Sequence, residues 1–227
     1  MSFLLPAGLS QAGHALHRRF AFDGAMRRFL SDPAGAAKLP SRVLDRLVFG
    51  WGNPGWSGHA EYLQACIVHA FNCDGPILEC GSGLTTLLVG HVARLNGNSM
   101  WSLEHIPEWA TRVQHALDRY GIRSVSICRA PIRSYGDLDW YDTSPHALPH
   151  SFSLVICDGP PSATRGGRYG LSQVLRDQLA SDCTILLDDA SRADEMRLAV
   201  QWGRELGMSW ERRGVEKPYF VLTRSSA

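Results

Sequence analysis

The sequence lacks the features of several large protein classes. Its 227 residues contain no long uncharged apolar run, so no segment is predicted to span a bilayer. Lysine and arginine number 23 against 22 aspartate and glutamate residues, and a formal charge of +1 gives little attraction for nucleic acid or an anionic membrane. Residues 1–6 show neither the basic start nor the apolar core of a signal peptide. We therefore expect a cytoplasmic protein with no nucleic-acid and no membrane partner.

Motifs of several catalytic and metal-binding classes are also missing. There is no Gly-x-Ser-x-Gly elbow and no phosphate loop ending in Gly-Lys-Ser/Thr, which argues against hydrolases and nucleotidases. The six cysteines form no CxxC pair, and four of them lie in or beside apolar strand-like runs: Cys80, Cys128, Cys157 and Cys183. We interpret them as buried free thiols rather than as disulfides or zinc ligands.

The most informative segment is residues 76–86, with the sequence PILECGSGLTT. An apolar run reaches the acidic residue Glu79, breaks into a turn that contains Gly81 and Gly83, and restarts as an amphipathic pattern. Glycine allows left-handed backbone torsions and lets a ligand approach the main chain closely. The segment therefore predicts a strand, a glycine loop and a helix around a small cofactor.

Strand-like and helix-like patterns alternate from residue 60 onward. Predicted strands cover residues 77–80, 100–103, 125–128, 152–157, 184–187, 208–211 and 219–223, and predicted helices cover residues 60–71, 84–95, 107–120, 171–179 and 192–206. We interpret residues 59–227 as one α/β domain with a doubly wound, mostly parallel seven-stranded sheet whose last strand is antiparallel. Residues 1–58, which include an amphipathic stretch, Trp51 and Trp56, predict an N-terminal helical cap.

Four of the predicted strands end in or just before carboxylates. Glu79 and Glu104 close the first two strands, Asp158 follows the fourth, and the pair Asp188 and Asp189 follows the fifth. Ligands of an open α/β sheet bind outside the carboxyl ends of its strands, so these side chains mark the predicted site. Each carboxylate alone could instead cap a helix or a turn. Their repetition along one edge favours a binding site.

Glu104 indicates a nucleoside cofactor. A carboxylate at the end of the second strand can accept both hydroxyl hydrogens of a ribose. A dinucleotide site normally continues to a third glycine, and that position holds Thr85. This departure counts against an NAD-dependent oxidoreductase, which stays as an alternative function.

With these residues the sequence resembles the class I S-adenosylmethionine-dependent methyltransferases, whose first motif, acidic-x-Gly-x-Gly, is matched by residues 79–83. The resemblance implies a Rossmann-like fold and S-adenosylmethionine as cofactor. It also implies that Gly81 and Gly83 lie under the methionine part, that Glu79 orients the amino group and that Glu104 holds the ribose. The implied cofactor-binding residues are Glu79, Cys80, Gly81, Ser82, Gly83, Thr85, Glu104, His105, Ala130 and Asp158.

Asp158, Asp188 and Asp189 are similar to the carboxylates of metal-dependent O-methyltransferases, which end the fourth and fifth strands and bind one magnesium ion. Mg²⁺ prefers hard oxygen ligands and lowers the pKa of a bound hydroxyl. The resemblance therefore implies Asp158 and Asp188 as catalytic residues and a magnesium site at all three aspartates. The alternative is that Asp188 or Asp189 caps the helix that follows.

The sequence thus predicts an enzyme that transfers a methyl group from S-adenosylmethionine to a small-molecule acceptor, with a hydroxyl as the expected group. The fourth strand is followed by Asp-Gly-Pro-Pro and not by the Asn/Asp-Pro-Pro-aromatic motif of nitrogen-methylating enzymes. Arg165 and Arg168 either bind an acidic substrate group or pair with neighbouring carboxylates. A catalytically silent cofactor-binding module is a second alternative. Self-association into a homodimer is left open.

Overall fold

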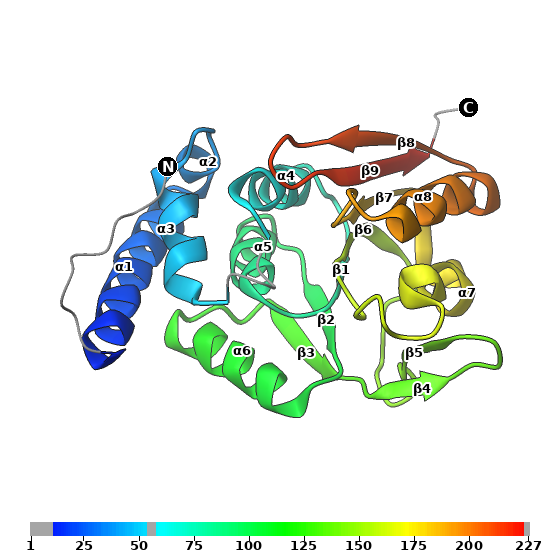
Figure 1. Ribbon diagram of the computed structural model, residues 1–227, viewed down its shortest axis with the longest axis horizontal. Helices are drawn as coiled ribbons and strands as arrows, with labels where there is room; N and C mark the ends of the chain where they lie inside the picture. Colours follow the sequence, from blue (N-terminus) through cyan, green and yellow to red (C-terminus); the bar gives the residue numbers. More distant parts are fainter. Residues whose placement is uncertain (1–10, 54–57, 225–227) are drawn as a thin grey trace.

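The computed structural model describes residues 11–53 and 58–224. One seven-stranded sheet lies between two layers of helices (Figure 1). Its strands are β1 (Ile77–Cys80), β2 (Met100–Glu104), β3 (Val125–Arg129), β6 (Phe152–Cys157), β7 (Leu179–Leu187), β8 (Met208–Arg213) and β9 (Tyr219–Arg224). In space they follow the order β3-β2-β1-β6-β7-β9-β8. Only β9 runs antiparallel to its neighbours, β7 and β8, which confirms the predicted doubly wound sheet.

The sheet is apolar on both faces because each face is covered by helices. Leu154 and Ile156 of β6 pack into the core formed with α4 (Ala60–Phe71), α5 (Leu84–Leu95) and α6 (Pro107–Arg119). The alternating residues Val155 and Cys157 pack into the opposite core, formed with α7 (Gly170–Val174) and α8 (Ala193–Leu206). Successive side chains point to opposite faces, and both faces are buried, so successive positions of the strand are apolar and the sequence shows a continuous apolar run.

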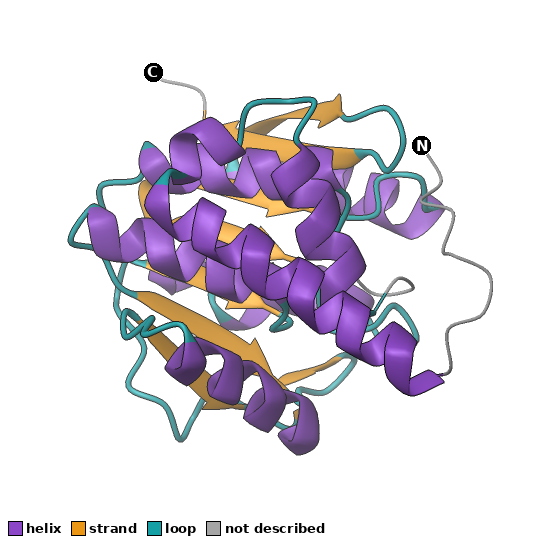
Figure 2. Ribbon diagram, turned by 90° about the vertical axis from the view of Figure 1, so that its left-hand side faces the viewer, coloured by secondary structure: helices purple, strands orange, loops and turns teal. Residues whose placement is uncertain are grey.

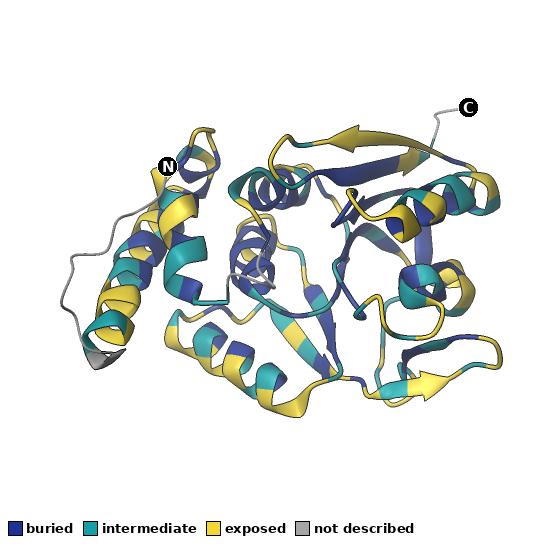
Figure 3. Ribbon diagram, in the orientation of Figure 1, coloured by how far each residue is buried: buried dark blue, intermediate teal, exposed yellow. Residues whose placement is uncertain are grey.

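The predicted cap consists of α1 (Gln11–Ser31), α2 (Pro33–Ala36) and α3 (Arg42–Trp51). Ser41 begins α3 as an N-cap, because its hydroxyl accepts a hydrogen bond from the Leu44 amide. Phe22, Met26 and Phe29 of α1 are buried in the same core as α4 and α5. Figure 2 shows the helices on this side in front of the strands, and Figure 3 shows the exposed outer side of α1. Residues 1–10 and Trp56, also assigned to the cap, lie outside the described residues.

Two predictions of secondary structure were wrong. The predicted helix at 171–179 ends at Val174, continues as the 3₁₀ turn Arg176–Gln178 and gives way to β7, because Leu179 already pairs with Phe152 of β6. The predicted connection after β3 contains a hairpin of β4 (Ile132–Ser134) and β5 (Asp139–Tyr141). Both differences come from tertiary pairing, which local patterns do not report.

The strand order reverses between β1 and β6, and this reversal positions the site. Cys80 and Cys157 are paired in the parallel register, so the glycine loop after β1 meets the loop after β6. The amides of Asp158 and Gly159 both donate to the Cys80 carbonyl, at 3.0 and 2.7 Å. The two loops are therefore fixed to each other at the carboxyl edge of the sheet.

Candidate functional site

A cavity of about 770 Å³ lies at this carboxyl edge. Eight of the predicted site residues line it: Gly81, Ser82, Gly83, Thr85, Glu104, His105, Asp158 and Asp189. The other predicted residues do not reach it, because Glu79, Cys80, Ala130 and Asp188 are fully buried behind the loops. The volume falls in the range of small-molecule and cofactor sites, about 300 to 1,000 Å³.

Gly81 is required by the geometry of the loop. Its φ of 92° lies in the left-handed region, and a Cβ at this position would come within 3.2 Å of the Gly159 amide nitrogen. A side chain here would therefore both strain the backbone and push the two loops apart. The glycine allows the loop to lie directly against the loop after β6 and beside the cavity.

Glu104 lies at the cavity wall and is held as a carboxylate. One of its oxygens accepts from the Ser82 amide at 3.1 Å and the Ser82 hydroxyl at 2.7 Å, and the other accepts from the Ile106 amide at 2.9 Å. Burial acts to raise the pKa of Glu104, but hydrogen bonds led by His105 hold that pKa below its ordinary value. The site thus presents a fixed negative charge where the predicted ribose carboxylate belongs.

Glu79 occupies a different environment from the one predicted. Its carboxylate is fully buried and accepts hydrogen bonds from the hydroxyls of Thr85, Thr86 and Ser102. Burial raises the pKa of Glu79 to about 7, although these hydroxyls act to lower it. The Thr86 hydroxyl also accepts from the Gly83 amide at 2.7 Å. Glu79 therefore holds the start of α5 through hydrogen bonds made in the protein interior, and it does not line the cavity.

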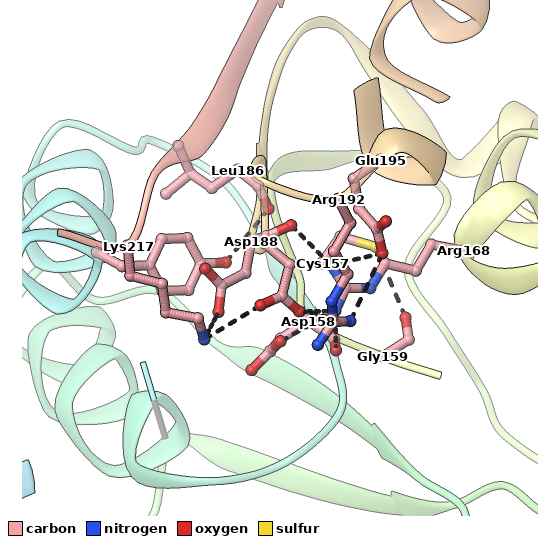
Figure 4. A network of polar contacts seen from close by, with 11 residues as sticks. Cys157, Asp158, Gly159, Arg168, Leu186, Asp188, Arg192, Glu195 and Lys217 are labelled. Carbon is pink, nitrogen blue, oxygen red and sulfur yellow. Dashed lines mark hydrogen bonds and ion pairs between the residues drawn. The ribbon is translucent and has the colours of Figure 1, made fainter. Parts of the chain in front are cut away.

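Carboxylate oxygens of Asp158, Asp188 and Asp189 lie within 4.8 Å of one another, as the magnesium prediction requires. Protein cations, however, already occupy the space between them (Figure 4). Arg168 is 3% exposed, and its Nη2 lies 3.2 Å from Asp158 Oδ1 and 2.9 Å from Asp189 Oδ2. Of the two roles predicted for Arg168, the structure shows pairing with neighbouring carboxylates. Arg165 likewise pairs with Asp139.

Lys217 reaches the same cluster from the turn between β8 and β9. Its Nζ lies 2.7 Å from Asp188 Oδ2 and 3.3 Å from Asp189 Oδ1. Burial opposes charging of the ammonium, but Asp188 raises the pKa of Lys217 above its ordinary value, so the side chain stays positive. Burial and the charge of Asp188 raise the pKa of Asp158. Despite burial, Arg168 and its neighbouring cations hold the pKa of Asp189 low.

The residues present do not fit a magnesium ion. The ion pairs of the cluster join four carboxylates to three cations, a formal net charge of −1; the members are Asp158, Asp188, Asp189 and Glu195 with Arg168, Arg192 and Lys217. A dication would leave an excess positive charge and would have to displace the bonded ammonium and guanidinium.

The chain is similar in structure to several methyltransferases. A methyltransferase of Podospora anserina, solved with SAH bound, aligns over 100% of both chains with a TM-score of 0.57 and 14% identity. Precorrin-6y C5,15-methyltransferase of Geobacter metallireducens aligns over 75% of this chain and 91% of its own, with a TM-score of 0.54 and 16% identity. The chain has the fold of these methyltransferases. The sequence itself matches no protein-family model and no curated protein.

The methyltransferase fold confirms the predicted Rossmann-like architecture. Sequence identities of 14 and 16% establish similarity of fold alone. A methyltransferase of Pyrococcus furiosus, at 15% identity and a TM-score of 0.53, aligns over 90% of this chain and 100% of its own. Within residues 11–53 and 58–224, no helix is both long and apolar enough to cross a membrane.

Two features of the cavity wall were not predicted from the sequence. The indole of Trp109 donates to the Ser82 carbonyl at 2.7 Å, so α6 holds the glycine loop from the side. The guanidinium of Arg112 lies over the rings of both Trp51 and Trp109, 4.9 and 4.6 Å from their centroids, and donates to the Trp51 carbonyl at 2.6 Å. The cap and α6 are thus joined at the cavity through cation–π contacts of one arginine and its hydrogen bond to Trp51. The i, i+3 spacing of Trp109 and Arg112 was the one available signal.

Tyr141 is a third residue that sequence reasoning missed. It is fully buried, lines the cavity, and its hydroxyl has no hydrogen-bond partner among the described residues. A Cβ on Gly159 would come within 2.3 Å of this hydroxyl, so the glycine leaves room for it. It was missed because the hairpin that carries it was predicted as an irregular connection. A buried hydroxyl without a partner is available to a ligand in the cavity.

Proposed function

We propose that the protein transfers the methyl group of S-adenosylmethionine to a hydroxyl of a small-molecule acceptor. The observation that carries the proposal is the ionised Glu104 carboxylate, fixed to the glycine loop at the wall of the cavity. A ribose can bind such a carboxylate through its two hydroxyls, while the methionine part follows Gly81 and Gly83. The fold shared with an SAH-bound methyltransferase supports this cofactor.

Charged groups from two sets of strand ends line the cavity, which suits a cofactor and an acceptor. Glu104 and His105 lie at the end next to α6, whereas Asp158, Asp189 and Lys217 lie at the end next to β7. A volume of about 770 Å³ accommodates a nucleoside cofactor together with a small acceptor. The balanced net charge of the chain favours such an acceptor over a nucleic acid.

S-adenosylmethionine, when bound, supplies an electrophilic methyl group on a sulfur that leaves as a neutral thioether. The residues of this chain align the acceptor and remove its proton, since displacement at a methyl carbon needs alignment above all. Methyl transfer to the acceptor oxygen would form the oxygen–carbon bond and break the carbon–sulfur bond, with its electron pair left on sulfur. The hydroxyl proton passes to the carboxylate of Asp158, which is 27% exposed at the cavity.

The mechanism uses no metal step, because Arg168 and Lys217 hold the carboxylates that a magnesium ion would need. Asp188, predicted as catalytic, is fully buried and lies outside the cavity, so it acts through its ion pair with Lys217. Arg168 fixes Asp158 by donating to its carbonyl at 2.7 Å as well as contacting its carboxylate. The chain thus positions the proton acceptor with a buried arginine.

Calorimetry with S-adenosylhomocysteine and with NAD tests the cofactor class. We expect S-adenosylhomocysteine to bind and Glu104→Gln to weaken it about tenfold to 150-fold, the range for a lost hydrogen bond to a charged group. Glu108→Gln is the matched control, because Glu108 also lines the cavity but lies on the exposed first turn of α6. Binding of NAD alone, or equal losses in both variants, would contradict the proposal.

The acceptor class is tested by methyl transfer. Purified protein and labelled S-adenosylmethionine are incubated with separate pools of phenols, sugars, carboxylic acids and amines, and methylated products are counted. We expect product from a hydroxyl pool and a large loss of turnover in Asp158→Asn with S-adenosylhomocysteine affinity retained. Cofactor binding without product from any pool would favour the catalytically silent module instead.

A further inference from the structure

Lys217 is placed to do more than pair with two aspartates. Its side chain extends from the turn between β8 and β9 to the carboxyl end of β7, where it lines the cavity (Figure 4). It is 25% exposed, whereas its partner Asp188 is fully buried. The ammonium is therefore the part of this ion pair that faces a ligand.

An ammonium group has three N–H donors, and two carboxylate oxygens do not exhaust them. The Nζ atom contacts Asp188 Oδ2 and Asp189 Oδ1. Within residues 11–53 and 58–224 it has no third acceptor. The two carboxylates anchor the ammonium from the protein side, so one N–H is left for the cavity.

Three cations of the cluster line the cavity, namely Arg168, Arg192 and Lys217, and they are the groups that can meet an oxygen anion there. Arg168 and Lys217 approach the oxygens that would otherwise ligate a metal, and they leave the cluster at a formal charge of −1. An acceptor oxygen that becomes negative as it loses its proton needs a local donor, and Lys217 is a cation at the cavity with an N–H left for it.

We propose that Lys217 binds the acceptor oxygen through this N–H and does so in place of a metal ion. The proposal rests on the function proposed above and specifies its substrate class. The acceptor is a hydroxyl whose oxygen can carry negative charge, as in a phenol or an enol. An amine that is protonated would meet the Lys217 ammonium as a second donor with no lone pair to accept its N–H, so an amine acceptor is disfavoured.

The test uses 4-nitrophenol as the probe, because its phenolate and phenol absorb at different wavelengths. The probe is titrated with the S-adenosylhomocysteine complex of the full chain at the pH where half of the free probe is ionised. S-adenosylhomocysteine has no sulfonium charge, so a shift reports groups of the protein. We expect the acid constant of the bound probe to exceed that of the free probe about tenfold or more.

Three variants test whether Lys217 causes the shift in the acid constant of the probe. Lys217→Met should abolish it, and the double variant Lys217→Met/Asp188→Asn should abolish it while also removing the buried uncompensated charge that could prevent folding. Arg192→Met is the matched control, because Arg192 lines the same cavity but is 49% exposed. It should keep most of the shift. Retained S-adenosylhomocysteine affinity and thermal unfolding show that each variant is folded.

Three results would overturn the inference. The first is the same absorbance shift in the double variant as in the wild type, and the second is no shift in the wild type. The third is a shift that appears only with added Mg²⁺ and vanishes with a chelator. Failure of the proposed function has a different signature, namely no S-adenosylhomocysteine binding and no methylated hydroxyl. A double variant that keeps both the shift and methyl transfer would refute the role of Lys217 alone.

Discussion

Replacing Glu79 by glutamine should change how the stability of the protein depends on pH. Glu79 is fully buried and its pKa is raised from 4.5 to about 7, mainly by burial. A carboxyl group whose pKa is higher in the folded protein than in the unfolded chain binds its proton more tightly when the protein is folded. Its stabilising contribution is therefore complete below pH 4.5 and is lost as the pH rises toward 7.

The size of the effect follows from the two pKa values. Each pH unit between them corresponds to about 1.4 kcal/mol, so the change from 4.5 to about 7 amounts to about 3 kcal/mol. Glutamine is close in shape and does not titrate. Its different hydrogen bonds with Thr85, Thr86 and Ser102 should shift stability by a constant amount at every pH.

Urea unfolding of both proteins at pH 5, 6, 7 and 8 measures this effect. We expect the free energy of unfolding of the wild type, relative to Glu79→Gln, to fall by about 2 to 3 kcal/mol between pH 5 and 7 and then to level off. Glu108→Gln is the exposed control and should show no such slope. A constant difference between wild type and Glu79→Gln over the whole range would refute the buried, raised-pKa description of this carboxyl.

Three further variants test the packing around the site. Gly90→Ala should destabilise by about 1 to 3 kcal/mol in urea unfolding, because the new Cβ would lie 2.3 Å from a Val125 methyl; adding Val125→Ala should relieve it. Trp109→Phe removes the hydrogen bond to Ser82 but keeps a ring, so calorimetry should show S-adenosylhomocysteine affinity falling roughly threefold to tenfold. Arg168→Met should cost about 3 to 5 kcal/mol in thermal or urea unfolding, with partial recovery on acidification as the carboxylates protonate.

Each of these has a result that would count against it. Equal stability of Gly90→Ala and wild type would show that the contact with Val125 is not tight. Unchanged cofactor affinity in Trp109→Phe would show that the hydrogen bond from α6 to the glycine loop does not contribute to cofactor binding. For Arg168→Met, a loss of less than 1 kcal/mol would mean that Asp158, Asp189 and Glu195 do not depend on this guanidinium.

The sequence determined the sheet, the glycine loop and Glu104, because these are local signals. A buried parallel strand is a short apolar run, and a loop with a positive φ needs glycine, as Gly81 shows. The carboxyl ends of parallel strands share one edge, so Glu104 and Asp158 could be assigned to the same site before their contacts were known. These inferences use only the pattern of residues adjacent in the sequence and the shared direction of parallel strands.

Only the tertiary structure decided the state of each charged group. Glu79 and Glu104 look equivalent as strand-end acids, yet one is buried behind the loop with a raised pKa and the other lines the cavity with a lowered one. Their difference depends on which hydroxyls and amides surround them. Burial and hydrogen bonding are sums over neighbours from distant segments, and a sequence pattern does not contain them.

The magnesium prediction illustrates the same limit. The three aspartates follow from strand ends. Arg168, in the 3₁₀ turn Gly167–Tyr169, and Lys217, in the turn between β8 and β9, lie 10 or more residues away along the chain and reach them by tertiary packing. The sequence by itself therefore determined that carboxylates meet at this edge. The tertiary structure decided that side-chain cations hold them, because ion pairs form wherever folding brings opposite charges within a few ångströms, whatever their separation along the chain.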